Sequence, residues 1–204
     1  MHRNNKGFSL KTVNDALEFI VLVVLFLVFV FEKKAATQGY RIFYILFMIA
    51  ALILLRLLHK VNDTRKLGMP DYLFTMIIIG GYMSIFGEFF FNLFYTIPFY
   101  DKILHLVIPA ITTVIFYLVL KDQKILRAVA AVLASLGLSA LWEIMEWSMD
   151  QLIMKSSYMQ GVLINFEFRM NPFTDTMLDL VFGLVASVIT AAVLYLFNKK
   201  ENED

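Results

Sequence analysis

The chain has 204 residues, of which 60% are hydrophobic and 17% charged, and it carries a formal net charge of +1 and no cysteine. Soluble domains are about half apolar and about a quarter charged, so this composition indicates a membrane protein. The near-neutral charge gives no indication of nucleic acid as a partner. The absence of cysteine excludes disulfides, thiolate metal ligands and a cysteine nucleophile within this sequence.

Apolar runs recur along the whole chain, and most approach the roughly 20 residues that a helix needs to cross a bilayer. The first, 17–31, is followed directly by Glu32, Lys33 and Lys34. These charges are typical of a helix end rather than of a signal-peptide cleavage site, so we expect this helix to be retained. The other runs are 40–58, 72–95, 101–120, 125–149 and 173–197.

The pattern predicts an all-α polytopic membrane helix bundle of about six transmembrane helices, with 1–204 as a single membrane domain. If the N-terminus lies inside, the inner segments carry twice as many Lys and Arg residues as the outer ones. Positive charge favours the cytoplasmic side, so we expect both termini to be cytoplasmic. The outer connection 150–172 mixes apolar and polar residues, which fits either an interfacial lid or an ordinary loop among the headgroups.

Ionisable residues occur near one end of four predicted helices. Such residues cost about 2.5–3.5 kcal/mol each at a helix centre on insertion scales, so they indicate function. In the predicted topology all of them fall within about two turns of the outer interface, at about 1.5 Å per residue. They are Glu88 (with the polar, uncharged Asn92), Asp101 and His105, Glu143 and Glu146, and Asp175 and Asp179.

Small residues share the helical face of these acids. Residues four apart lie on the same side of a helix, and small residues mark the faces where membrane helices pack closely. Three such rows are Gly80, Ser84, Glu88 and Asn92; Ala131, Ser135, Ser139 and Glu143; and Asp175, Asp179, Gly183, Ser187 and Ala191. The acids are therefore predicted to point into the bundle and to meet in one site.

A histidine among several carboxylates is typical of a site for zinc, manganese, iron or magnesium. The predicted ligands, enough for one or two divalent ions, are His105, Glu143, Glu146, Asp175 and Asp179. Asp101 or Glu88 is predicted to orient His105 or to act as a general base. The alternatives are interhelical hydrogen bonds for Glu88 and Asn92, helix N-caps for Asp101 and Asp175, and a proton- or cation-coupled polar cavity.

Three segments carry a family resemblance: 100–105 (YDKILH), 140–147 (ALWEIMEW) and 175–179 (DTMLD). They resemble, in this order, the Asp-x-x-x-His, Glu-x-x-Glu-Trp and Asp-Thr-x-x-Asp elements of the YjdF-like family of bacterial inner-membrane proteins. The first segment is also similar to the VanZ-like family, which is associated with glycopeptide-antibiotic resistance. The resemblance covers about 72–197 and implies a bacterial cytoplasmic (inner) membrane location, but no biochemical activity.

One segment departs from the YjdF-like pattern. That family often has a Gly- and Asp-rich approach to the last aspartate pair, whereas 169–174 reads RMNPFT here. Ligands from this loop are therefore not expected.

Three functions remain open from the sequence. The first is a metal-dependent membrane hydrolase or transferase that acts near the outer leaflet on a membrane lipid or lipid-linked envelope precursor. The second is a proton- or cation-coupled transporter, although such carriers usually bind near the midplane between internal repeats, and no repeat is evident. The third is a non-catalytic membrane protein of the resistance or immunity type. The sequence does not indicate an oligomeric state.

Overall fold

A computed structural model describes residues 10–31, 38–65, 69–85, 87, 91, 93–97, 99–120, 124–154, 163–164, 167–168 and 170–200. The elements are α1 (Leu10–Phe31), α2 (Gln38–Arg65), α3 (Asp71–Ile85), α4 (Leu93–Thr96), α5 (Tyr100–Val119), α6 (Lys124–Ser148), the π-helical turn η3 (Met149–Met154), β1 (Leu163–Ile164), β2 (Glu167–Phe168) and α7 (Pro172–Lys200). β1 and β2 pair antiparallel, with Leu163 opposite Phe168.

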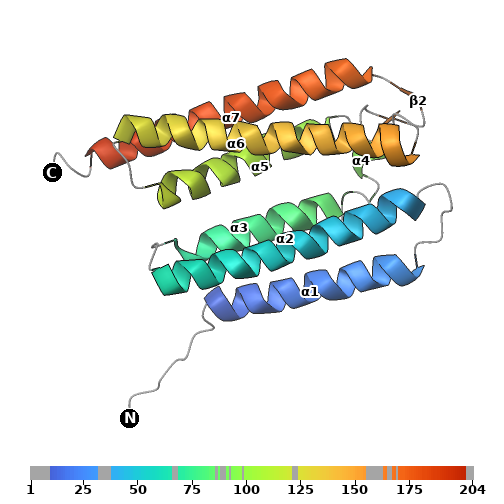
Figure 1. Ribbon diagram of the computed structural model, residues 1–204, viewed down its shortest axis with the longest axis horizontal. Coiled ribbons are helices and arrows are strands. Elements are labelled where there is room, and N and C mark those ends of the chain that lie inside the picture. The colour runs from blue at the N-terminus through green and yellow to red at the C-terminus, as the bar shows by residue number, and fades with distance from the viewer. Residues whose placement is uncertain are drawn as a thin grey trace, which may run out of the picture.

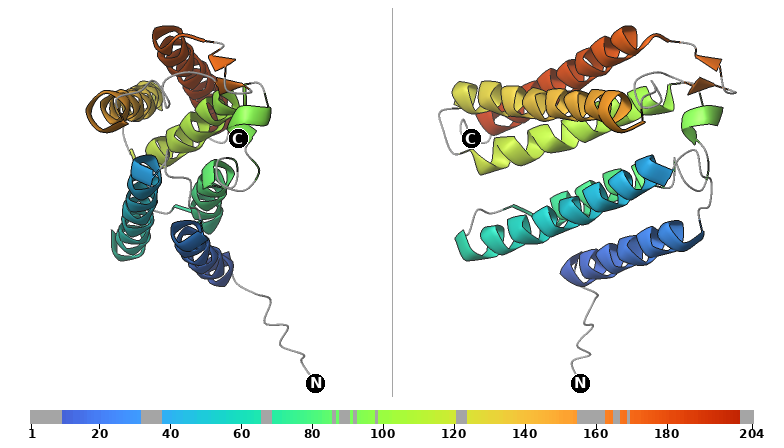
Figure 2. Two further views of the ribbon diagram at one scale, coloured as in Figure 1. Left: turned by 90° about the vertical axis from the view of Figure 1, so that its right-hand side faces the viewer. Right: turned by 45° about the vertical axis from the view of Figure 1, so that its right-hand side comes forward.

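The long helices lie side by side in two groups, α1–α3 and α5–α7 (Figures 1 and 2). Contacts are densest among α5, α6 and α7, and α3 connects the two groups mainly through α5. The short helix α4 and the hairpin lie at the end of the bundle where α5 and α7 begin and α6 ends (Figure 1). The predicted all-α helical bundle is therefore confirmed.

Three described helices are long and apolar enough to cross a membrane: Tyr100–Val119, Ile125–Leu152 and Pro172–Asn198. Asp71–Met83 in α3 is a shorter apolar helix. Large apolar side chains cover the outward faces of α6 and α7; Leu133 is 63% exposed and Ile189 58%. A surface of this kind is stable against lipid rather than water, which supports a membrane location.

The third predicted segment, 72–95, is not one continuous helix. α3 ends at Ile85, Phe91 lies in a bend, and α4 follows as a separate turn. Tyr100 packs against the last turn of α3, where its hydroxyl donates a hydrogen bond to the carbonyl oxygen of Met83 at 2.7 Å. A Cβ atom at Gly87 would lie only 2.5 Å from the Tyr100 ring, so this position needs glycine for the ring to pack there.

Small and polar residues hold α5, α6 and α7 together. The Ser135 hydroxyl lies 2.7 Å from Thr112 Oγ1, 3.0 Å from the carbonyl oxygen of Pro109 and 3.1 Å from Ser187 Oγ. These contacts join all three helices. Interhelical hydrogen bonds of this kind typically contribute about 0.6 kcal/mol each in a membrane protein.

Candidate functional site

The predicted acids of α5, α6 and α7 lie at one end of the bundle. Asp101 and His105 belong to the first turns of α5, and Asp175 and Asp179 to the first turns of α7. Glu143 and Glu146 belong to the last turns of α6. All of them are buried except Asp101, which is partly exposed.

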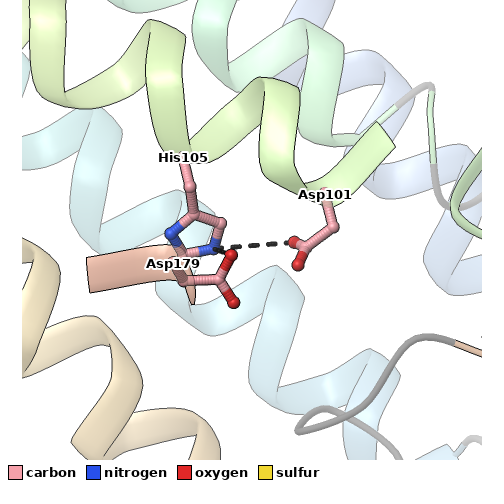
Figure 3. Close-up of side chains that lie close together, drawn as sticks. All are labelled: Asp101, His105 and Asp179. Atoms are coloured by element: carbon pink, nitrogen blue, oxygen red, sulfur yellow. Dashed lines mark ion pairs between the residues drawn. The ribbon is translucent and has the colours of Figure 1, made fainter. Parts of the chain in front are cut away.

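His105 lies at the centre of this group, as Figure 3 shows for Asp101 and Asp179. Its Nε2 atom is 3.6 Å from Asp101 Oδ1 and 3.9 Å from Asp179 Oδ1. Its Nδ1 atom is 3.7 Å from Glu143 Oε1. These separations are longer than direct hydrogen bonds, so the imidazole has carboxylates on both sides without being locked to either.

Lys102 joins the aspartates of α5 and α7 and is only 2% exposed. Its Nζ atom donates hydrogen bonds to Asp101 Oδ2 at 3.0 Å, to Asp179 Oδ2 at 2.7 Å, and to Asp175 Oδ1. Burying a charge is costly unless it is paired and hydrogen-bonded, and here each of the three ammonium hydrogens has a carboxylate. Lys102 is therefore the internal counter-ion of this cluster.

Two buried carboxylate oxygens of the site accept no hydrogen bond within the described residues: Glu143 Oε1 and Asp179 Oδ1. Both face a nitrogen of His105. Three potential ligand atoms lie within 4.8 Å of one another, one each from Asp101, His105 and Asp179. Asp179 Oδ1 also lies 2.7 Å from Lys102 Nζ, so Glu143 Oε1 is the oxygen left without a close donor. Carboxylate oxygens beside an imidazole form a donor set that fits a divalent cation.

A cavity of about 450 Å³ reaches this site from between the two helix groups. Asp101, His105 and Glu146 contribute the charged part of its lining. The rest is mainly apolar and includes Leu52 and Leu55 of α2, Ile77 and Ile78 of α3, and Leu104 and Ile108 of α5. Its volume lies within the roughly 300–1,000 Å³ of typical ligand sites.

The site residues predicted from sequence have different placements. Asp101, His105, Glu143 and Asp179 are brought together, and Glu146 lines the same cavity. Asp175 instead pairs with Lys102. Glu88 and Asn92 lie outside the described residues.

The N-cap alternative fails for both aspartates. The N-cap position of α5 is Phe99, with φ 65° in the left-handed region. At α7 the Asn171 side chain accepts a hydrogen bond from the backbone N–H of Thr174 at 2.8 Å. Asp101 and Asp175 therefore lie inside their helices, and their carboxylates are available to the site.

Sequence reasoning missed Lys102 and Asp150. Lys102 was counted with the outer positive charges, although its position one residue after Asp101 and three before His105 was visible in the YDKILH segment. Asp150 is fully buried in η3. An α-helix that continues past Ser148 as a π-turn has no distinctive sequence pattern here.

Comparisons with known proteins agree with a membrane location. The family described as "Predicted membrane protein (DUF2238)" matches residues 15–200. An uncharacterised protein of Thermotoga maritima is 25% identical over 170 residues, which cover 80% of this chain and 78% of that protein. No solved structure matches. Since the family match takes in all three long apolar helices and every described site residue, the chain belongs to the DUF2238 family of predicted membrane proteins.

Proposed function

We propose that this protein is a metal-dependent membrane hydrolase or transferase that acts on a lipid or lipid-linked substrate. One observation carries the proposal: Asp101 and His105, two of the three residues of the possible ligand group, line a mainly apolar cavity. The apolar lining fits an alkyl chain, and the charged end fits the group on which the chemistry occurs.

Charge balance supports a cation beside His105. The site contains the carboxyl groups of Asp101, Glu143, Glu146, Asp175 and Asp179 but one ammonium group, that of Lys102, which pairs with the three aspartates. Buried carboxylates in excess of their counter-ions need protons or a cation. A divalent ion held by Asp101, His105 and Asp179 would supply that charge, activate water and polarise a phosphoryl or carbonyl oxygen.

The protein's own residues have distinct roles in this proposal. Asp101, His105 and Asp179 hold the ion, and Glu143 lies on the Nδ1 side of His105, where it can orient the ring. Glu146 lines the cavity and can exchange a proton with the substrate. The resemblance to YjdF-like proteins supports the same three elements and a bacterial cytoplasmic membrane. The distribution of Lys and Arg favours an orientation in which this end of the bundle faces outward.

Metal analysis of the purified full-length protein in detergent tests the proposal. We expect bound Mn²⁺ or Zn²⁺ that is lost in Asp179→Asn and His105→Ala but retained in Asp15→Asn, an exposed acid of α1 paired with Arg56. The second arm incubates the protein with extracted bacterial lipids and follows products by mass spectrometry, with and without EDTA.

The two arms have separate outcomes. A product that forms only with metal supports the enzyme. A protein that binds no metal overturns the metal-dependent function. Cation flux into liposomes that Glu143→Gln abolishes would instead identify a transporter.

A further inference from the structure

Asp101 presents its two oxygens to different neighbours, whereas both oxygens of Asp179 lie close to Lys102 and one of them also faces His105. Asp101 accepts a hydrogen bond from Lys102 through Oδ2, while its Oδ1 lies 3.6 Å from His105 Nε2. Asp179 likewise accepts from Lys102 through Oδ2, while its Oδ1 lies 3.9 Å from the same nitrogen. Lys102 Nζ is also 2.7 Å from Asp179 Oδ1, so this oxygen lies between the ammonium group and the imidazole.

Carboxylates shared in this way between Lys102 and the position beside His105 resemble the carboxylates that bridge a pair of cations. In two-metal sites the ions lie about 3.5–4 Å apart, and shared ligands bind both. Here the position shared by Asp101, Asp175 and Asp179 is taken by an ammonium group. The position shared by Asp101, His105 and Asp179 is bounded by His105 Nε2, Asp101 Oδ1 and Asp179 Oδ1, and the last of these atoms also lies 2.7 Å from Lys102 Nζ.

We propose that the Lys102 ammonium takes the place of a second metal ion, so that the site binds a single divalent cation beside His105. An ammonium group has three donors and no acceptor, which matches the three carboxylates that surround it. With 2% of its surface exposed, Lys102 leaves no room for a second ion among Asp101, Asp175 and Asp179. This inference rests on the proposed function only in using the same metal position.

The inference makes Lys102 a positioning residue with a specific role. It holds Asp101 and Asp179 with one oxygen each toward His105, and it neutralises part of their charge. With the ammonium group in place, the cluster also has less uncompensated negative charge to attract a second divalent ion. Replacing Lys102 by an uncharged residue should therefore open a second cation site rather than only weaken the first.

The experiment is a Mn²⁺ titration of the purified full-length protein, with bound metal counted after desalting and followed by electron paramagnetic resonance. We expect one uncoupled Mn²⁺ per chain in the wild type and in Lys102→Arg, which keeps the charge. We expect two spin-coupled ions in Lys102→Met, which keeps an unbranched side chain as far as Cε and removes the ammonium group. Lys60→Ala, at an exposed lysine of α2, is the control and should bind one ion.

The outcomes separate this inference from the proposed function. Two ions in the wild type, or one uncoupled ion in Lys102→Met, overturn the inference and leave the metal-dependent function standing. No ion in the wild type together with Mn²⁺ uptake by Lys102→Met overturns the function but supports Lys102 as the cation of the site. No ion in either protein overturns both. If Lys102→Met does not fold, the wild-type and Lys102→Arg stoichiometries decide, because two ions in either contradict the inference.

Discussion

At the residue scale, Glu143 is an unusual buried carboxylate. It does not pair with Lys102, and one of its oxygens accepts no hydrogen bond within the described residues. Glu143 is 4% exposed, and its Oε1 faces His105 Nδ1 at 3.7 Å without a hydrogen bond. Leaving a buried charged group unsatisfied costs stability. Residues that exist only to stabilise the fold do not carry such a cost, so Glu143 is better explained by ligand binding or by orientation of His105.

Glu143→Gln should separate stability from metal binding. The amide keeps the shape of the side chain but removes a negative charge from a site that holds several, so the metal-free variant should melt at a temperature no lower than the wild type. Its Mn²⁺ affinity should fall by about 10–100-fold, as is typical when a partner of a metal-binding histidine is changed. Thermal unfolding in EDTA and a Mn²⁺ titration measure the two effects. A lower melting temperature with unchanged affinity would show that Glu143 is structural only.

At the element scale, the site depends on how closely α7 approaches α5 and α6. Gly183 lies one turn after Asp179, and a Cβ atom there would be 3.2 Å from Ser139 Oγ and 3.4 Å from Pro109 Cγ. Both contacts are tighter than ordinary van der Waals packing. The missing side chain therefore allows the approach that brings Asp179 next to His105 and Lys102.

Gly183→Ala and Gly137→Ala form a matched pair that tests this approach. Gly137 lies in the middle of α6 with nothing within 4 Å of its Cβ position, so alanine there should stabilise the helix by about 0.5–1 kcal/mol. Gly183→Ala should instead cost about 1–3 kcal/mol through overpacking and weaken Mn²⁺ binding. Unfolding in detergent measures both variants. Equal effects of the two substitutions would show that the close approach at Gly183 does not matter.

The elements also show what sequence could and could not predict. The rows of small residues that contain Glu143 and Asp179 correctly predicted inward faces, because small residues repeated every four positions mark the side of a helix that packs against other helices. The end of α3 at Ile85 was not predicted. Glu88 and Asn92 interrupt the apolar run 72–95, but their spacing fits a continuous helical face, and the contact of Tyr100 with Met83 is not visible in the sequence. Lys102 was missed because a lysine beside a helix start normally reaches toward water, and only the three-dimensional positions of Asp175 and Asp179 make it a buried counter-ion.

At the scale of the whole molecule, the orientation of the bundle decides which membrane face the site serves. The absence of cysteine from the chain makes single-cysteine labelling unambiguous. Asn171→Cys, an exposed position before α7 at the site end, should react with a membrane-impermeant maleimide in intact cells. Lys60→Cys, an exposed position near the end of α2, should react only after permeabilisation. The reverse pattern would place the site at the cytoplasmic face and contradict the predicted topology.

The two helix groups together create the cavity, because its lining combines α2 and α3 with α5 and α6. If it holds the alkyl part of a lipid, filling it should remove the lipid without removing the metal. Ala51 of α2 lines the cavity, and Ala51→Trp should reduce co-purified lipid, measured by native mass spectrometry, and any lipid-directed activity by at least tenfold.

Val129→Trp is the control, since Val129 is 51% exposed on α6 and does not belong to the cavity lining. Mn²⁺ binding should stay unchanged in both variants, because neither position touches Asp101, His105 or Asp179 in the ligand cluster. Lipid retained at wild-type levels by Ala51→Trp would mean that the substrate reaches the carboxylates by another route, and the proposed role of the α1–α3 group in binding it would be wrong.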